Sequence, residues 1–295
     1  LKLATSMIKI TPSWFELMTA AALSCFANNA VDVAVIEVGM LGRYDATNIA
    51  DAEVAIITNV GFDHTDGAEG WRERLAWEKA GIIKDGSVVC LGDTDDEIEH
   101  LILQENSAKI LRRGIDFACI ENDLAIGGRH LSLRINDVIY ENIFLSQHGV
   151  HQGKNAAIAL AGATAFLDLE IPVSIVENSF QDITLPGRFE VISKEPLVIL
   201  DGAHNPPGAL AAAQTLKSSF TLEGSKILIV GMTEEKDADW MLSNLNASEF
   251  DVIFATEASS PRSMSSQDLA MVASNYCSKT FTCPEPEEAL KEAIQ

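Results

Sequence analysis

Short apolar runs that stop abruptly at a polar residue recur along this chain, and they constrain its fold more than any other feature. Val33–Ile36 stops at Glu37, and Leu197–Leu200 stops at Asp201. Runs of this length are typical of buried strands. They alternate with helical stretches, and such alternation indicates a mostly parallel sheet covered by helices. We therefore predict an α/β fold.

The expected elements follow this alternation through the chain. The expected strands are residues 33–36, 54–59, 88–91, 197–200, 227–230 and 252–255. The expected helices are residues 14–27, 71–79, 95–103, 155–169, 207–218 and 265–276, with another near Trp240. The first helix is apolar on most sides, so we expect it to be buried against a sheet. Between residues 117 and 145, short alternating segments separated by turn residues predict an antiparallel meander.

The alternation is broken once, at Leu185–Glu190, by a Pro-Gly pair. A chain of 295 residues is long enough for two domains, each with its own core. We place the boundary at this break. The prediction is a central domain over residues 1–185, with a small antiparallel part, followed by a small Rossmann-like domain over residues 186–295.

The charge and cysteine content limit the possible partners and compartment. The net charge is −22, with 43 acidic against 21 basic residues, which argues against non-specific nucleic-acid binding and against docking to anionic membranes. No apolar run approaches the roughly 20 residues that a membrane span needs, and no signal peptide opens the sequence. Five cysteines, an odd number without a C-x-x-C pair, suit a reducing compartment. We expect a cytoplasmic monomer.

Polar residues at the strand ends are the first candidates for a site, because ligands sit at the carboxyl ends of parallel strands. Glu37 is followed closely by Gly39, Gly42 and Arg43, so it is placed to hold a metal or to face phosphate. His64 follows the strand that ends at Asn59, although a lone histidine is more often structural or solvated.

Two helix ends carry further candidates. Lys79 closes a helix before a glycine cap, where it also complements the helix dipole, and the residues alone favour that simpler interpretation. His151, Gln152 and Asn155 stand at the start of another helix, where exposed backbone N–H groups favour an anion or a polar ring.

Six motifs in order carry a resemblance to a known family: EVGMLGRYDATN, ITNVGFDHTDG, WEKAGIIK, HQGKNAAIAL, LPGRFE and LDGAHNPPG. They resemble motifs of the folylpolyglutamate synthases, including the bifunctional dihydrofolate synthases, within the Mur ligase superfamily. The similarity runs from about Thr11 to about Arg262. The DGAHNP form is more similar to the folate branch than to the peptidoglycan branch.

The resemblance implies an ATP-dependent ligase of folate biosynthesis and one-carbon metabolism. A carboxylate of folate or dihydropteroate attacks the γ-phosphate of ATP, which gives an acyl phosphate and ADP. The amine of L-glutamate then forms the amide. Glu37 and His64 match the family's Mg²⁺ ligands, and Lys79 matches a lysine that is carbamylated in related enzymes.

The resemblance also implies the residues around the nucleotide. Asn155 matches the adenine-side residue, Arg188 a phosphate-contacting arginine at the hinge, and Asp201 a ribose contact. His204 matches a histidine near the phosphates and the incoming glutamate. Lys79, Arg188 and His204 are therefore the expected catalytic residues.

The sequence departs from the family pattern at three places. Leu41 replaces the first of two paired glycines, Ala68-Glu69 replace a Leu-Gly pair, and the P-loop is absent. The stretch His151–Asn155 contains a Gly-Lys pair without the upstream glycine or the following hydroxyl. Because the family carries its P-loop upstream of Thr11, and its last strand beyond Gln295, we expect a fragment that is inactive by itself.

Two alternatives remain open at this stage. One is another Mur-type amide ligase with the same metal chemistry and a different acceptor. The other is a non-catalytic remnant that binds a nucleotide or a partner. The absent P-loop favours the remnant, whereas the presence of Glu37, His64 and Lys79 argues against it.

Overall fold

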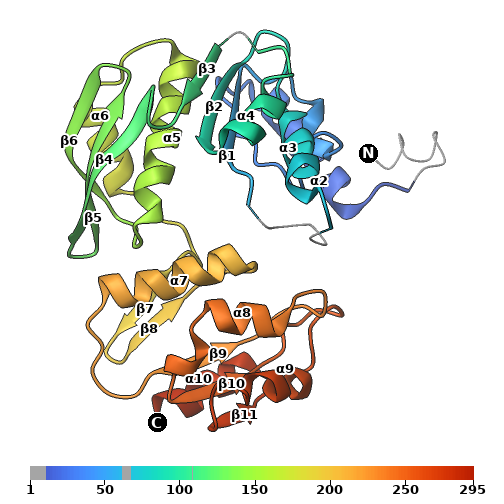
Figure 1. The fold of residues 1–295 in the computed structure, drawn as a ribbon, viewed down its shortest axis with the longest axis vertical. Helices are drawn as coiled ribbons and strands as arrows, with labels where there is room; N and C mark the ends of the chain where they lie inside the picture. Colours follow the sequence, from blue (N-terminus) through green and yellow to red (C-terminus); the bar gives the residue numbers. More distant parts are fainter. Residues whose placement is uncertain (1–10, 62–67, 108) are drawn as a thin grey trace. The chain divides into compact units, whose positions relative to one another are not determined.

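In the computed structural model, which describes residues 11–61, 68–107 and 109–295, the chain forms two compact units (Figure 1). The first unit extends to Ala118 and includes Ile158–Glu170. The second comprises Cys119–Ala157 and Ile171–Gln295, so both units draw on helix α5 (His151–Leu167). The α/β fold class is confirmed.

The first unit is built on a parallel three-stranded sheet. Its strands, in spatial order, are β1 (Val54–Asn59), β2 (Val88–Asp93) and β3 (Lys109–Arg112). The first two were expected and the third was not. The expected helices are present as α3 (Trp71–Ala80) and α4 (Asp96–Ile102). Helix α4 begins where Asp95 caps it, since the Asp95 side chain accepts a hydrogen bond from the Ile98 N–H at 3.0 Å.

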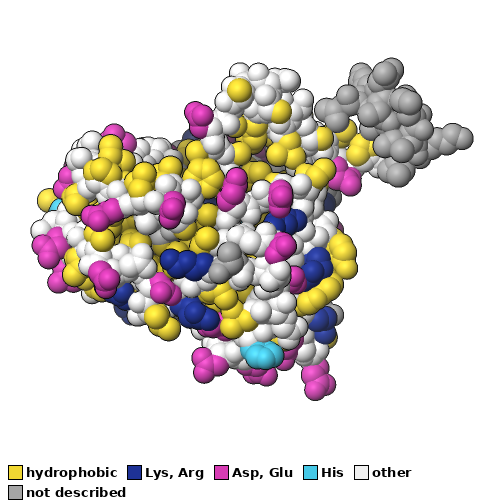
Figure 2. All heavy atoms as spheres, turned by 90° about the horizontal axis from the view of Figure 1, so that it is seen from above, with side chains coloured by type: hydrophobic (Ala, Val, Ile, Leu, Met, Phe, Trp, Pro, Cys, Tyr) yellow, Lys and Arg dark blue, Asp and Glu magenta, His cyan; other side chains and the backbone are white. Residues whose placement is uncertain are grey.

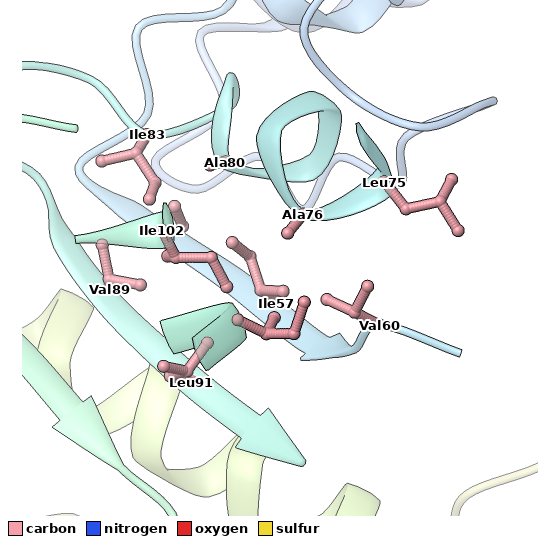
Figure 3. Close-up of a cluster of buried hydrophobic side chains, with 11 residues drawn as sticks. Ile57, Val60, Leu75, Ala76, Ala80, Ile83, Val89, Leu91 and Ile102 are labelled. Atoms are coloured by element: carbon pink, nitrogen blue, oxygen red, sulfur yellow. The ribbon is translucent and has the colours of Figure 1, made fainter. Parts of the chain in front are cut away.

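Helices α3 and α4 cover one face of this sheet and bury its main core (Figure 3). Ile57 and Leu91 from the sheet meet Ala76 of α3 and Ile102 of α4 there. On the other face, α5 approaches β1 closely, because a Cβ atom on its Gly162 would lie 2.6 Å from Cδ1 of Ile56. The sheet therefore has helices on both sides, as the alternating pattern predicts, although Ile56 remains 40% exposed.

The first helix, α2 (Trp14–Asn29), forms where it was expected, but it is not buried. The Ser13 hydroxyl accepts from the Glu16 N–H at 3.2 Å and the Glu16 carboxylate accepts from the Ser13 N–H at 2.6 Å, which makes a capping box. Trp14 is nevertheless 73% exposed, and no residue of the helix is buried. The helix packs on the short 3-10 helix η1 (Ala46–Ile49) instead of on a sheet.

The strand expected at Val33–Ile36 is wrong. Residues 33–38 form no regular secondary structure, and Val35 is 92% exposed. A strand forms only where a neighbouring strand accepts and donates its backbone hydrogen bonds. In the described sheet of the first unit, β1 pairs with β2 and β2 pairs with β3, and residues 33–36 are not part of that sheet. An apolar run predicts that burial of its side chains is favourable, but it does not predict whether another strand lies beside it to pair with.

The second unit begins with the expected antiparallel meander. Its strands are β4 (Phe117–Ala125), β5 (Gly128–Ile135) and β6 (Val138–Leu145), in that spatial order. Helix α6 (Val173–Gln181), which the sequence did not reveal, packs on β6. The buried Tyr140 hydroxyl donates to the Ile171 carbonyl oxygen at 3.1 Å and thereby ties β6 to the segment before α6.

The rest of the second unit contains the expected Rossmann-like alternation, with one change. It comprises β7 (Glu190–Lys194), β8 (Leu197–Leu200), α7 (Pro206–Ser219), β9 (Ile227–Val230), α8 (Ala238–Asn244), η2 (Ala247–Glu249), β10 (Val252–Ala255), α9 (Ser266–Ala273), β11 (Thr280–Thr282) and α10 (Pro286–Ile294). Strands β9, β10 and β11 form a parallel sheet. Strand β8 was expected beside them, but it pairs antiparallel with β7 in a separate two-stranded sheet.

Acidic side chains are spread over the face drawn in Figure 2, between exposed apolar ones, as the net charge of −22 leads one to expect. None of the described helices combines the length and apolar character needed to cross a bilayer.

Candidate functional site

Lys79 lies in the last turn of α3 and reaches the carboxyl end of β1. Its ammonium group donates to the backbone oxygen of Asn59 at 2.9 Å. The side chain therefore arrives at the strand end at which parallel sheets hold ligands. Gly81 follows as the expected C-cap, although its φ of −62° is right-handed, so a positive φ is not what requires glycine there.

Arg43 does not stand free beside Glu37. Its guanidinium donates to the Trp77 carbonyl oxygen from Nε at 3.2 Å and from Nη2 at 2.9 Å, and it forms an ion pair with Glu105. It also lies 4.0 Å from the centre of the Trp77 ring, within the range of a cation–π contact. Arg43, which the sequence places near Glu37, therefore joins a loop to α3.

Glu37 is exposed, in the unpaired segment described above. Gly39, two residues on, packs against the Phe15 ring of α2, where a Cβ atom would come within 2.3 Å of the ring. His64 lies outside the described residues, so its place beside Glu37 stays a prediction.

Glu37 is the expected metal ligand that lies within the described residues. Within residues 11–61, 68–107 and 109–295 no group of three or more His, Cys, Asp or Glu side chains could hold a metal ion. Magnesium is held by one or two carboxylates, with water and substrate phosphates completing its shell. Glu37 can supply such a carboxylate.

Asp45 stabilises the turn that follows Glu37. Burial raises the pKa of its carboxyl, but hydrogen bonds from Thr47, Met40 and Gly39 outweigh this and bring the pKa below its ordinary value. The Thr47 N–H donates to Oδ1 at 2.9 Å and the Met40 N–H donates to Oδ2 at 2.8 Å. The carboxylate is thus held ionised as the cap of η1.

In the second unit, hydrogen bonds join two loops that carry predicted site residues. The Asp201 carboxylate accepts from the Phe189 N–H at 2.8 Å and from the Ala203 N–H at 2.9 Å. The Gly202 N–H donates to the Gly187 carbonyl oxygen at 2.7 Å. These bonds bring the loop of Arg188 to the carboxyl end of β8, where Asp201 lies.

His204 belongs to the same pair of loops. Its Nδ1 lies 3.2 Å from the Gly202 carbonyl oxygen, and both His204 and Arg188 are exposed. The structure therefore brings the loop of Arg188 beside the loop that carries Asp201 and His204. It also gives Asp201 a structural task, because both carboxylate oxygens accept backbone N–H groups.

Phe189 anchors this region, and sequence reasoning missed it. Its φ of 50° is left-handed, which is unusual for an aromatic residue, and its side chain is buried. The ring lies 5.7 Å from that of Phe220 and 6.3 Å from that of His148. The only sequence signal was its place directly after the Pro-Gly-Arg turn.

Asn155 stands in the first turn of α5, as expected, and is exposed. Its amide donates to the Gln152 side chain at 2.9 Å. His151 begins the same helix. Burial lowers the pKa of its imidazole, the Asp201 carboxylate opposes that shift, and the charge of Arg129 adds to it. Arg129, buried in β5, is a second residue that the motifs did not point to.

A cavity of about 410 Å³ opens beside Arg188. Gln147, His148 and Phe189 are among its lining residues. Oε1 of Gln147 and Nδ1 of His148 are buried and have no hydrogen-bond partner among the described residues. Burial lowers the pKa of His148, and the charge of Arg129 adds to the effect, so the ring favours its neutral form.

Two family profiles together match most of the chain. The profile described as Mur ligase middle domain matches residues 11–163, and the profile described as Mur ligase, glutamate ligase domain matches residues 187–295. A curated relative, dihydrofolate synthase/folylpolyglutamate synthase of Mycobacterium tuberculosis, is 38% identical over 274 residues. The match covers 88% of this chain and 56% of the relative, so the chain spans little more than half of the relative's length.

Solved structures agree with these matches. Mycobacterium tuberculosis folylpolyglutamate synthase complexed with ADP aligns with a TM-score of 0.92 at 34% identity, over 98% of this chain and 66% of that one. A bifunctional folylpolyglutamate synthase/dihydrofolate synthase with Mn, AMPPNP and L-glutamate bound aligns with a TM-score of 0.81 at 29% identity, over 97% of this chain and 66% of that one.

Proposed function

Because the chain belongs to the folylpolyglutamate synthase/dihydrofolate synthase family of Mur ligases, we propose that it serves an ATP-dependent ligation of L-glutamate to folate or dihydropteroate. The observation that carries the proposal is the ordered match to both Mur ligase domains along one chain. Two further observations support it: the loops of Arg188 and Asp201 are joined by hydrogen bonds, and Lys79 lies at the end of β1.

The reaction has two steps. A carboxylate oxygen of the acceptor attacks the γ-phosphorus of ATP, the bond to the β-phosphate oxygen breaks, and ADP leaves. The amine of glutamate then attacks the acyl carbon and loses a proton. Phosphate departs with the former carboxylate oxygen, and an amide remains. Both steps bring anions together, so cations must neutralise the charge that develops on the phosphoryl oxygens.

Glu37 and His64 are the proposed ligands of Mg²⁺, which when bound would neutralise phosphate charge. Lys79 is proposed to act at the same edge of the sheet, either as an ammonium group or carbamylated as in related enzymes. Its hydrogen bond to the Asn59 carbonyl oxygen supports this position, since Asn59 ends β1 just before the segment that contains His64.

Arg188, Asn155, Asp201 and His204 are the proposed residues on the nucleotide and glutamate side. Arg188 is exposed beside a cavity and can meet the transferring phosphoryl group. Asp201 keeps lone pairs for a ribose hydroxyl after it accepts two backbone N–H groups. His204, exposed on the adjoining loop, is proposed to act near the incoming glutamate.

The wider assignment follows from the same family. We propose ATP, Mg²⁺, L-glutamate and a folate-type acceptor as ligands, a monomer, and no nucleic-acid or membrane partner, in line with the net charge of −22. All five cysteines are free, which suits the cytoplasm. A domain boundary between residues 185 and 186 is supported by the family profiles, which stop at 163 and resume at 187.

The test compares acceptors in the intact protein. We expect glutamate-dependent ADP release with dihydropteroate or tetrahydrofolate, and none with muramyl nucleotides. Release with a muramyl nucleotide alone would assign another Mur-type ligase, and release with none of them would overturn the proposal.

Glu37→Gln tests the metal assignment in the same assay. We expect this variant to abolish turnover while the circular dichroism spectrum is unchanged, because the amide removes one anionic metal ligand. Glu53→Gln, which makes the same exchange just before the amino end of β1, should keep the wild-type rate. Near-normal turnover in Glu37→Gln would show that the metal assignment is wrong.

A further inference from the structure

The C-terminal turn of α3 is capped by a residue far away in the sequence. The last four carbonyl groups of a helix lack partners within the helix. Here the Arg43 guanidinium donates to the Trp77 carbonyl oxygen and the Arg43 N–H donates to the Glu78 carbonyl oxygen at 2.8 Å. A cation at this end of a helix also meets the favourable end of the dipole.

The loop and the helix end fit closely together. A Cβ atom on Gly81 would lie 2.4 Å from the Cβ of Arg43, and one on Gly42 would lie 2.8 Å from the Glu78 carbonyl oxygen. The Asn48 amide donates to the carbonyl oxygens of Arg43 at 2.8 Å and of Gly81 at 3.0 Å. Gly42 and Gly81 are therefore required, because the loop that contains Arg43 approaches the C-terminal end of α3 closely. We call this contact between the loop and the helix end the joint.

Arg43 is itself held on two further sides. It pairs with Glu105, and the two side chains are only 22% and 28% exposed. Its guanidinium plane also covers the Trp77 ring at 4.0 Å. Five donors in a rigid fork make these contacts possible together, which a lysine could not reproduce.

The joint connects two residues that the proposed reaction needs at one place. Glu37 precedes Arg43 in the loop, and Lys79 is part of the helix end that Arg43 caps. We propose that Arg43 is a positioning residue, which fixes the loop of Glu37 to the end of α3 and so sets the place of Lys79 against it. This rests on the proposed function of Glu37 and Lys79 in one reaction.

Kinetics of Arg43→Met and Arg43→Lys in the intact protein test the inference. Misplacement by about 1 Å costs up to about 100-fold in rate, so we expect kcat per folded molecule to fall by at least about 10-fold in both variants. Arg188 and Asn155 are unchanged, so the KM for ATP should stay within about twofold. Arg43→Lys keeps the charge, and its failure to restore kcat would assign the effect to geometry.

Arg112→Met is the matched control, because Arg112 forms a similar, partly shielded ion pair with Glu99 in the same unit. A merely structural role predicts equal losses of melting temperature and of kcat in Arg43→Met and Arg112→Met, and that result would overturn the inference.

Hydrogen exchange gives a readout that does not depend on catalysis. We expect Arg43→Met to speed amide exchange both in residues 37–48 and at the end of α3, whereas Arg112→Met leaves both unchanged. If the wild-type protein lacks ligase activity but the two variants still differ in amide exchange in this way, the proposed function is wrong, whereas the role of Arg43 in holding the loop to the end of α3 is supported. Unchanged exchange in Arg43→Met overturns the inference in either case.

Discussion

At the scale of single residues, the departure of Leu41 from the family's glycine has a structural explanation. Leu41 occupies the left-handed region with a φ of 62°, which costs roughly 1–2 kcal/mol for a residue with a side chain. Its side chain packs partly buried against the core of the first unit. Full burial of a leucine contributes about 1.5–3 kcal/mol, so the partial burial of Leu41 offsets part of the strain. The turn at Arg43 keeps its hydrogen bonds to α3.

The lowered pKa values of His148 and His151 predict how the free energy of unfolding depends on pH. Burial lowers the pKa of both side chains in the folded protein, so the unfolded chain binds more protons below its ordinary pKa of about 6.5. The stability these residues contribute is present above that pH and is lost as the pH falls toward the folded pKa values. Melting temperatures between pH 5 and 8 should therefore fall on the acid side.

A His148→Gln/His151→Gln double variant is the control for that dependence, because glutamine does not titrate. Its melting temperature should change less between pH 8 and pH 5 than that of the wild type. A wild-type protein that becomes more stable as the pH falls through 6.5 would contradict the assignment of neutral histidines.

At the scale of elements, the sequence predicts which residues form helices and strands better than it predicts which strands pair with each other. Strand β1 and helix α3 were predicted almost to the residue, since their residue patterns are local. Strand β8 was expected in the parallel sheet and lies in a hairpin with β7. The run Val33–Ile36 has the same apolar pattern and forms no strand. Pairing depends on distant backbone, which a local pattern does not contain.

Substitution of Val35 tests the exposure of that segment. Val35 is 92% exposed, so Val35→Ser should change the free energy of unfolding by less than about 0.5 kcal/mol. Ile57→Ser, in the buried core of the same unit, should cost about 2–5 kcal/mol. Urea denaturation measures both. Equal losses in the two variants would show that Val33–Ile36 is buried as a strand after all.

At the scale of the whole molecule, the motifs predicted candidate residues but not the contacts that hold their loops in place. The loop of Arg188 is hydrogen-bonded to the loop that carries Asp201 and His204. The buried anchors Phe189 and Arg129 carry no chemical signature in the sequence, because their importance depends on contacts made only after folding. The contacts of Arg43 could not be predicted for the same reason, since no local pattern shows that Trp77 and Glu105 bind it.

The two loops predict separate kinetic effects in the intact enzyme. Arg188→Ala should slow acyl-phosphate formation, because it removes a cation that we propose faces the transferring phosphoryl group. His204→Ala should slow the glutamate step more than the first. Single-turnover measurements with and without glutamate separate the steps, and Arg262→Ala, at another exposed arginine, should change neither. If both variants alter only substrate binding, these residues are placed wrongly.

The fate of one oxygen atom tests the acyl-phosphate route directly. The acceptor is labelled with ¹⁸O in its reacting carboxylate, and turnover with ATP and L-glutamate is followed by ³¹P NMR of the released phosphate. We predict one ¹⁸O atom in each phosphate, because the carboxylate oxygen that attacks ATP leaves with phosphate when the amide forms. Release of unlabelled phosphate during amide formation would contradict the account.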